Sequence, residues 1–185
     1  MNKQSQELIL NNLICPISKE NQILDNQKVD KNGLVVAGTS PLAPQLKDYI
    51  NENHLSNLEL VGYKSGIELN SIINKASFIV TPSEWYENNP MTIIEVFSYG
   101  KPAIGSNIGG IPELINNNQN GFIFHYGDVV ALANCINESV NISNEEYLIL
   151  ANNAGKFAEI NCSPEGHYNS LLDSYRDSIE NYNIQ

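Results

Sequence analysis

Short apolar runs alternate with longer segments of helical periodicity along most of the chain. Each run is closed by glycine, proline or asparagine, and the periodic segments carry apolar residues on one face. Such punctuation predicts strands followed by helices. The predicted strands are 34–37, 58–61, 78–80, 103–106 and 122–124, and the predicted helices are 44–52, 67–75, 91–99, 128–140, 145–159 and 164–180.

This alternation is typical of βαβ units, in which crossover helices join parallel strands. Strands that are apolar on both faces belong inside such a sheet. We therefore predict an α/β fold with a Rossmann-like, mostly parallel sheet flanked by helices. Ligands of open α/β sheets bind beyond the carboxyl ends of the strands, so a site is expected in the loops that follow them.

Three of the predicted helix ends carry their own signals. Asn89 before Pro90 predicts an N-cap residue followed by proline at the first helical position. Gly100 and Pro102 predict the end of that helix. Ser163-Pro164 repeats the start signal for the last helix.

The N-terminal part of the chain fits the pattern least well. Residues 6–14 have helical periodicity, residues 16–32 resemble a loop, and no strand precedes them. A doubly wound domain normally opens with a strand, so we expect the chain to begin inside a larger fold. We divide it into an irregular N-terminal segment of the same domain, the sheet domain and a C-terminal helix, over 1–32, 33–162 and 163–185.

Charge excludes several kinds of partner. The 185 residues contain 10 Lys plus Arg against 21 Asp plus Glu, for a net charge of −11 and a pI near 4.6. Such a balance argues against a nucleic-acid partner and against an anionic membrane surface. No apolar run approaches a membrane span, and membrane association is not evident. The three cysteines and three histidines are widely spaced, which predicts a cytoplasmic protein without disulfides or a metal site.

The most informative segment is 81–115. Glu87 lies in a predicted loop and Glu95 on the second turn of the predicted helix, with seven residues between them. Side chains on a helix lean toward its N-terminus, so both carboxylates can face one space above the strand end. The free amides of Met91 and Thr92 at the helix start suit a phosphate. A phosphate cradle beside two hydroxyl-binding carboxylates fits a nucleotide sugar or sugar phosphate as ligand. The spacing of the two glutamates alone favours a solvated helix face, so the choice between the two readings depends on the residues around them.

An ordered set of short motifs over about residues 33–140 resembles the donor-binding, C-terminal half of the retaining GT-B glycosyltransferases of family four, the glycosyl transferases group 1. The pair Glu87 and Glu95 matches the two glutamates of that family, which have seven residues between them. The other motifs, in chain order, are Gly38-Thr39-Ser40-Pro41, Leu60-Val61-Gly62-Tyr63, Ala76 to Ser83, Gly100-Lys101-Pro102, Gly109-Gly110-Ile111-Pro112-Glu113, Asn120-Gly121-Phe122 and Gly127-Asp128.

The resemblance implies an enzyme that transfers a sugar from a nucleotide-diphosphate donor to an acceptor, with no cofactor and no protein-bound metal. It implies that Glu95 holds the ribose and that Glu87 contacts the transferred sugar as the catalytic residue. The amides of Met91 and Thr92 would hold the diphosphate. The remaining donor-binding residues implied by the resemblance are Asn89, Gly38, Tyr63, Lys64 and Lys3, of which Tyr63 and Lys64 would lie by the nucleobase and Lys3 would neutralise the diphosphate.

The sequence departs from the family in several ways. Gly-Thr-Ser-Pro replaces the usual Gly-Asp-Gly-Pro turn, Glu-Asn-Asn-Pro replaces Glu-Gly-Phe-Gly, and no arginine precedes Arg176. In this fold the acceptor binds a separate N-terminal domain, and no segment of this sequence resembles one. We therefore expect either that the chain is a fragment of a longer protein or that its partner is a second chain. A non-catalytic nucleotide-sugar-binding module or a decayed remnant is the alternative. A dehydrogenase is disfavoured because no Gly-x-Gly-x-x-Gly follows a predicted strand.

Several residues near the paired glutamates have two readings. Gly109 and Gly110 serve either a tight turn or phosphate contact. For Glu113 we favour a helix-start position, and for Lys101 a solvated charge at a helix end. The aromatic pair Trp85-Tyr86 belongs either to the core or to the rim of a pocket.

Overall fold

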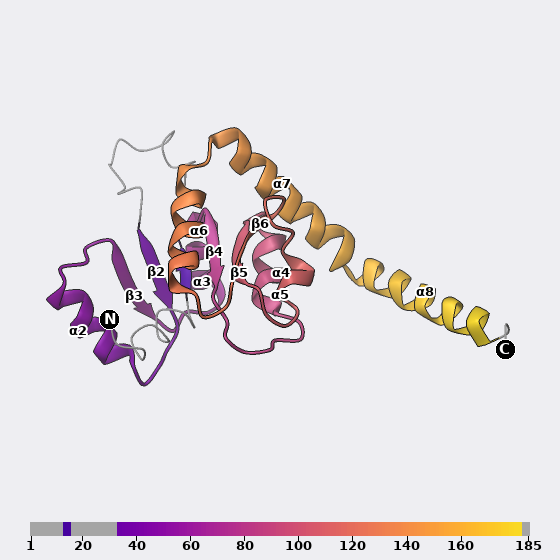
Figure 1. Cartoon of the computed structure of the whole chain (residues 1–185), viewed down its shortest axis with the longest axis horizontal. Coiled ribbons are helices and arrows are strands. Elements are labelled where there is room, and N and C mark those ends of the chain that lie inside the picture. The colour runs from indigo at the N-terminus through magenta and orange to yellow at the C-terminus, as the bar shows by residue number, and fades with distance from the viewer. Residues whose placement is uncertain (1–12, 16–32, 183–185) are drawn as a thin grey trace.

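The computed structural model describes residues 13–15 and 33–182, and their strands form one twisted sheet (Figure 1). The strand order is β3-β2-β1-β4-β5-β6. β2 pairs in parallel with β3, β4 with β5, and β5 with β6, whereas β1 runs antiparallel to both of its neighbours. The predicted α/β fold with a mostly parallel sheet is confirmed. The strands are β1 (Leu13–Cys15), β2 (Leu34–Ala37), β3 (Leu58–Gly62), β4 (Phe78–Thr81), β5 (Ala103–Ser106) and β6 (Gly121–Phe124).

Helices follow the strands as predicted, and their ends differ from the expected ones by at most two residues. The short α5 (Ile111–Leu114) was predicted only as a helix start at Glu113 and without bounds, because four residues cannot show helical periodicity. Among the helices of residues 33–182, none is long and apolar enough to cross a membrane. The other helices are α2 (Ala43–Glu52), α3 (Gly66–Lys75), α4 (Met91–Ser98), α6 (Val129–Asn141), α7 (Asn144–Asn161) and α8 (Pro164–Tyr182).

The expectation that no strand precedes the sheet domain is wrong, and so is the helix predicted over 6–14 where it includes residues 13 and 14. Leu13–Cys15 lies between β2 and β4, pairing with Val35 and Val36 on one side and with Phe78 and Ile79 on the other. Three residues are too few to show the alternation by which a strand is recognised. The predictions for residues 6–12 and 16–32 fall outside the described residues.

Apolar side chains fill both faces of the sheet. Successive residues of β4 point to opposite sides, so Phe78 and Val80 join one cluster while Ile79 joins the other. The first cluster packs against α6 and the start of α7, and the second against α3, α4, α5 and the end of α7. This two-sided burial leaves the strand ends and their loops as the places where polar groups gather.

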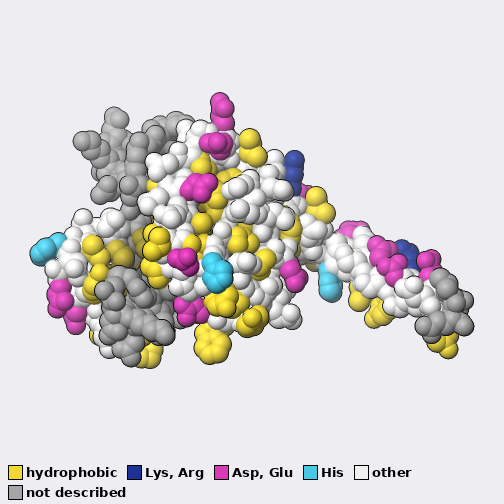
Figure 2. Space-filling view, viewed as in Figure 1, with side chains coloured by type: hydrophobic (Ala, Val, Ile, Leu, Met, Phe, Trp, Pro, Cys, Tyr) yellow, Lys and Arg dark blue, Asp and Glu magenta, His cyan; other side chains and the backbone are white. Residues whose placement is uncertain are grey.

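The last helix has little contact with the sheet. α8 extends away from the body of the molecule (Figure 1), and none of its residues is buried. Its predicted start signal is confirmed, because the Ser163 hydroxyl accepts a hydrogen bond from the amide of Gly166 at 3.0 Å. Acidic side chains outnumber basic ones on the face shown in Figure 2, in keeping with the net charge of −11.

Candidate functional site

A cleft of about 750 Å³ lies at the carboxyl ends of β2, β3 and β4, where a ligand site was expected. It is lined by residues from three separate strand-to-helix connections and from α4. Six of the predicted site residues line this cleft: Gly38, Tyr63, Lys64, Glu87, Thr92 and Glu95. A second groove of about 730 Å³, between α4 and α7, contains none of the predicted site residues.

The two glutamates approach the cleft from different elements. Glu87 is half-buried in the loop after β4, and Glu95 is exposed on the second turn of α4. Both line the same cleft, so the structure brings the two carboxylates into one space. Ionised carboxylates accept hydrogen bonds only, which makes this pair a receptor for hydroxyl groups.

The start of α4 differs by one residue from the prediction. Pro90, not Asn89, is the N-cap residue, with an extended backbone (φ −70°, ψ 93°), and Met91 is the first helical residue. Pro90 accepts a hydrogen bond from the Ile93 amide at 3.0 Å. Within residues 33–182, the amides of Met91 and Thr92 have no acceptor, as is usual in a first helical turn.

Only some of the side chains at the start of α4 line the cleft. Thr92 lines the cleft, whereas Met91 and Asn89 do not, and the Met91 side chain is 65% exposed. Any contribution of Met91 to a ligand in the cleft therefore comes from its backbone amide. An aligned pair of helix amides is a suitable partner for an anion.

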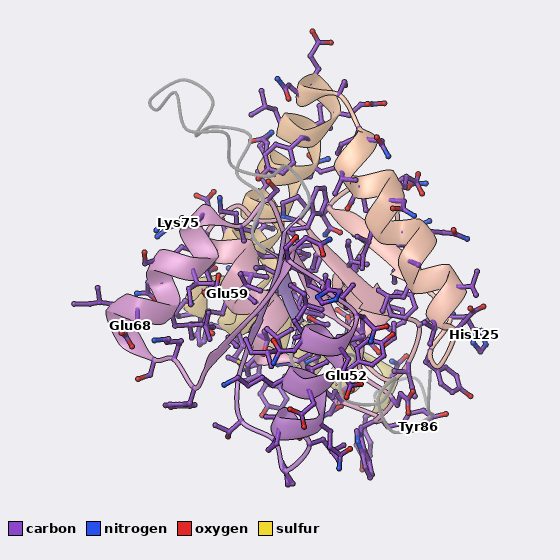
Figure 3. The ribbon with its side chains drawn as sticks, turned by 90° about the vertical axis from the view of Figure 1, so that its left-hand side faces the viewer. Glu52, Glu59, Glu68, Lys75, Tyr86 and His125 are labelled. Carbon is purple, nitrogen blue, oxygen red and sulfur yellow. The ribbon has the colours of Figure 1, made fainter. Side chains whose placement is uncertain are left out.

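The cleft is poor in positive charge. Lys64 is the only basic residue among those that line it, and its Nζ lies 3.5 Å from Glu68 Oε2. Glu68 projects from the outer side of α3 (Figure 3). Lys3, the other predicted cation, lies outside the described residues. Formally, the lining therefore holds two carboxylates against one ammonium group.

Aromatic residues surround the opening of the cleft. Trp85 lines it and is 76% exposed, while Tyr86 is 83% exposed and points away from the body of the molecule (Figure 3). Of the two readings for this pair, the core is therefore excluded and the rim applies to Trp85. Tyr63, in the loop after β3, also lines the cleft and is 71% exposed. Exposed rings of this kind offer flat surfaces for a nucleobase or a sugar.

The end of β5 and the loop after it support the loop that carries Glu87, and sequence reasoning missed this contact. The amide of Gly110 donates to the carbonyl of Glu87 at 2.7 Å. The Ser106 hydroxyl, fully buried, donates to the carbonyl of Ser83 at 2.6 Å. The paired glycines were the available signal, because adjacent glycines after a strand indicate close backbone approach.

Two other residues near the site have structural roles. Glu113 is in the first turn of α5, as favoured from the sequence. Lys101 was expected to be a solvated charge, but its Nζ donates to the Asn74 carbonyl at 3.0 Å, in the last turn of α3. A cation there satisfies a terminal carbonyl and complements the helix dipole.

Metal-ligating side chains do not gather in this part of the chain: residues 13–15 and 33–182 contain no group of three or more His, Cys, Asp or Glu that could hold a metal ion. Cys135 and Cys162 are free thiols. Burial raises the pKa of both, and nearby Glu138 raises the pKa of Cys135 further. At neutral pH both are therefore protonated and weakly nucleophilic.

Comparison with known proteins finds similarity to glycosyltransferases. The family model described as "Glycosyl transferases group 1" matches residues 17–157. An uncharacterised glycosyltransferase of Methanocaldococcus jannaschii is 33% identical over 109 residues, which is 59% of this chain and 30% of that protein. The Escherichia coli UDP-Gal:alpha-D-GlcNAc-diphosphoundecaprenol alpha-1,3-galactosyltransferase is 30% identical over 128 residues, 68% of this chain and 32% of that protein. The chain spans about a third of the length of these relatives.

Solved structures share the fold. HepE of Anabaena, in complex with UDP, aligns with a TM-score of 0.64 at 20% identity, over 95% of this chain and 51% of HepE. The C-terminal domain of a glycosyl transferase group 1 family protein from Francisella tularensis aligns with a TM-score of 0.57 at 16% identity, over 65% of this chain and 64% of that domain. At such identities these likenesses concern the fold, which is that of GT-B glycosyltransferases.

Proposed function

This chain belongs to the glycosyl transferases group 1, and we propose that it is the donor-binding, C-terminal half of a retaining enzyme that transfers a sugar from a nucleotide diphosphate to an acceptor. The observation that carries the proposal is the cleft, which collects two carboxylates and the open start of α4 at the carboxyl ends of three strands. The E. coli relative is named for the use of UDP-Gal, so a UDP-sugar is the first donor to test.

Each part of the donor has a partner in this proposal. Glu95 accepts hydrogen bonds from the ribose hydroxyls, and Glu87 from hydroxyls of the transferred sugar. The amides of Met91 and Thr92 hold the diphosphate at the start of α4. Tyr63 and Lys64 lie by the nucleobase. The two ends of the donor then occupy opposite sides of one cleft, with the ribose between them.

The chemistry follows from these positions. When the bond between the sugar and the β-phosphate oxygen breaks, negative charge develops on the leaving diphosphate. The amides and dipole of α4 stabilise that charge, which is the main catalytic contribution expected of this chain. No side chain of the cleft is proposed as a nucleophile. The acceptor and the groups that orient it belong to an N-terminal domain or partner chain, consistent with the fraction of its relatives that this chain spans.

Calorimetric titration of the 185-residue chain with UDP, GDP and ADP tests the ribose contact. Glu95→Ala is expected to weaken binding by about 1.5–3 kcal/mol, the range for a hydrogen bond to a charged group. Glu84→Ala is the matched control, because Glu84 is exposed in the loop after β4 and does not line the cleft. Equal affinity of Glu95→Ala and the unaltered chain would contradict the assignment.

The role of Glu87 is tested by comparing a nucleotide with its sugar conjugate. Glu87→Ala is expected to reduce the affinity for UDP-galactose or UDP-glucose while leaving the affinity for UDP nearly unchanged, because Glu87 contacts only the sugar. Equal losses for UDP and UDP-sugar would remove the hexose assignment.

A non-catalytic nucleotide-sugar-binding module is the second candidate. It is favoured by the single cation, Lys64, among the residues that line the cleft, since a leaving diphosphate requires charge neutralisation. Release of UDP from UDP-galactose or UDP-glucose, measured after addition of an N-terminal domain from a relative, separates the two candidates. Saturable binding without any release would favour the module.

A further inference from the structure

We infer that the last residue of β5 and the connection from β5 to α5 form a positioning device for Glu87, with Ser106 and Gly110 as its positioning residues. This inference rests on the proposed role of Glu87 as the contact for the transferred sugar. It concerns residues outside the cleft lining, which act on the sugar only through the backbone of the loop that carries Glu87.

The loop after β4 is held at two points along its length. At its base, the Ser83 carbonyl accepts from the Ser106 hydroxyl at 2.6 Å, and the exposed fractions of these two residues are 7% and 0%. At its far end, the Glu87 carbonyl accepts from the Gly110 amide at 2.7 Å. The two donors are the last residue of β5 and the residue before α5, so the loop after β4 is fixed against a single neighbouring segment, residues 106–110.

The backbone at Gly109 and Gly110 lies so close to the loop that carries Glu87 that neither position has room for a side chain. A Cβ on Gly110 would overlap the carbonyl oxygen of Asn88, and a Cβ on Gly109 would come within 2.5 Å of the carbonyl oxygen of Glu87. Gly110 has φ −80° and ψ −3°, a conformation that alanine adopts without strain. The reason for glycine at position 110 is therefore contact with the loop that carries Glu87, not backbone conformation.

The supporting segment is itself firmly held. The Asn107 amide donates to the carbonyl of Phe124 at the end of β6, at 2.7 Å. Ile111 and Ile115 are fully buried, and Gly105 has no room for a Cβ between them. If a substitution pushes the two backbones apart, we therefore expect the loop that carries Glu87 to move, because its residues Trp85 and Tyr86 are exposed.

Two variants test the inference in the full chain. Gly110→Ala adds a methyl group against Asn88, and Ser106→Ala removes the tie to Ser83. Each is expected to lower the affinity for UDP-galactose or UDP-glucose by about tenfold, a factor equivalent to about 1.4 kcal/mol, and to change the affinity for UDP by less than about twofold. Gly100→Ala is the matched control, because Gly100 has φ +64° and the substitution strains the fold away from this loop.

The single tryptophan of the chain gives a readout that needs no ligand. Trp85 lies two residues before Glu87, whose amide donates to the Trp85 carbonyl at 2.9 Å. Time-resolved fluorescence anisotropy of Trp85 is expected to show added local motion in Gly110→Ala and Ser106→Ala, and none in Gly100→Ala.

The outcomes separate this inference from the proposed function. Loss of the sugar-dependent part of the affinity, together with added motion of Trp85, supports the positioning role. Unchanged sugar-dependent affinity, equal losses for UDP and UDP-sugar, or unchanged Trp85 motion would each overturn it. If the unaltered chain binds neither ligand, the proposed function fails while Trp85 still decides whether Gly110 and Ser106 fix the loop.

Discussion

One lateral side of the sheet contains β2 and β3, and the other contains β4, β5 and α4. The two sides differ in how many of their residues are buried, although both contribute to the same cleft. All four residues of β5 are buried, whereas Val36 is the only buried residue of β2 and β3 has none. α4 buries three residues, while α2 and α3 bury one each. The side with β4, β5 and α4 carries the two glutamates, and the side with β2 and β3 carries Tyr63 and Lys64.

This difference separates two tasks within one site. Glutamates that orient a reacting sugar must be held within fractions of an ångström, which requires a tightly packed support. A residue beside a nucleobase contributes affinity and tolerates looser support. We therefore expect changes on the β5 side to affect stability and sugar orientation, and changes on the β3 side to affect mainly binding of the nucleotide.

The largest contrast is expected in the apolar core. Ile104→Ala in β5 removes a side chain with no exposed surface and should lower the free energy of unfolding by about 2–5 kcal/mol. Leu60→Ala in β3 removes a half-buried side chain and should cost about 1 kcal/mol, because less area returns to water. Urea unfolding followed by circular dichroism measures both. Equal losses would contradict the difference in packing between the two sides.

Helix caps provide a second, smaller contrast. Ser143 begins α7 with a complete capping box, accepting from the Glu146 amide at 3.2 Å, whereas Ser65 begins α3 without a side-chain cap. Ser143→Ala should lower the free energy of unfolding by about 1 kcal/mol. Ser65→Ala should leave it unchanged. A lower free energy of unfolding in Ser65→Ala would contradict this contrast, because it would mean that the Ser65 side chain does stabilise the start of α3.

The smallest expected effect concerns Lys64. Lys64→Ala should weaken UDP binding by about twofold to threefold, or about 0.4–0.7 kcal/mol, and should reduce the dependence of that binding on salt. The effect is limited because Lys64 is already paired with Glu68 at 3.5 Å. Lys75→Ala, at the far end of α3 (Figure 3), is the control. Equal weakening by both variants would indicate general charge attraction.

Local patterns predicted most of this architecture. Apolar runs such as Phe78–Val80 marked the central strands, and Asp128 was recognised at the start of α6, where its side chain accepts from the Ala131 amide. The pair Glu87 and Glu95 was singled out because the short motifs around it resemble those of a known family, and those motifs are local properties of the sequence. In each case residues close in sequence determine the structure.

Features that depend on distant partners were not predicted. β1 is a strand because the backbones of β2 and β4 pair with it, and nothing in Leu13–Cys15 alone reveals those neighbours. The contact between Gly110 and Glu87 joins residues more than twenty positions apart. Lys101 was taken as solvated because its acceptor, Asn74, belongs to another helix. Each of these required the tertiary arrangement.

The antiparallel strand β1 connects two parallel parts of the sheet, β2 with β3 and β4 with β5 and β6. Among the described strands, β2 and β4 are joined only through Leu13–Cys15. A chain shortened by its first 15 residues would expose two facing strand edges about 10 Å apart, twice the usual strand spacing. Unpaired edges of this kind accept an added strand. A synthetic peptide that carries Leu13–Cys15 is therefore expected to pair with both edges and to re-establish the relation between the two sides of the cleft.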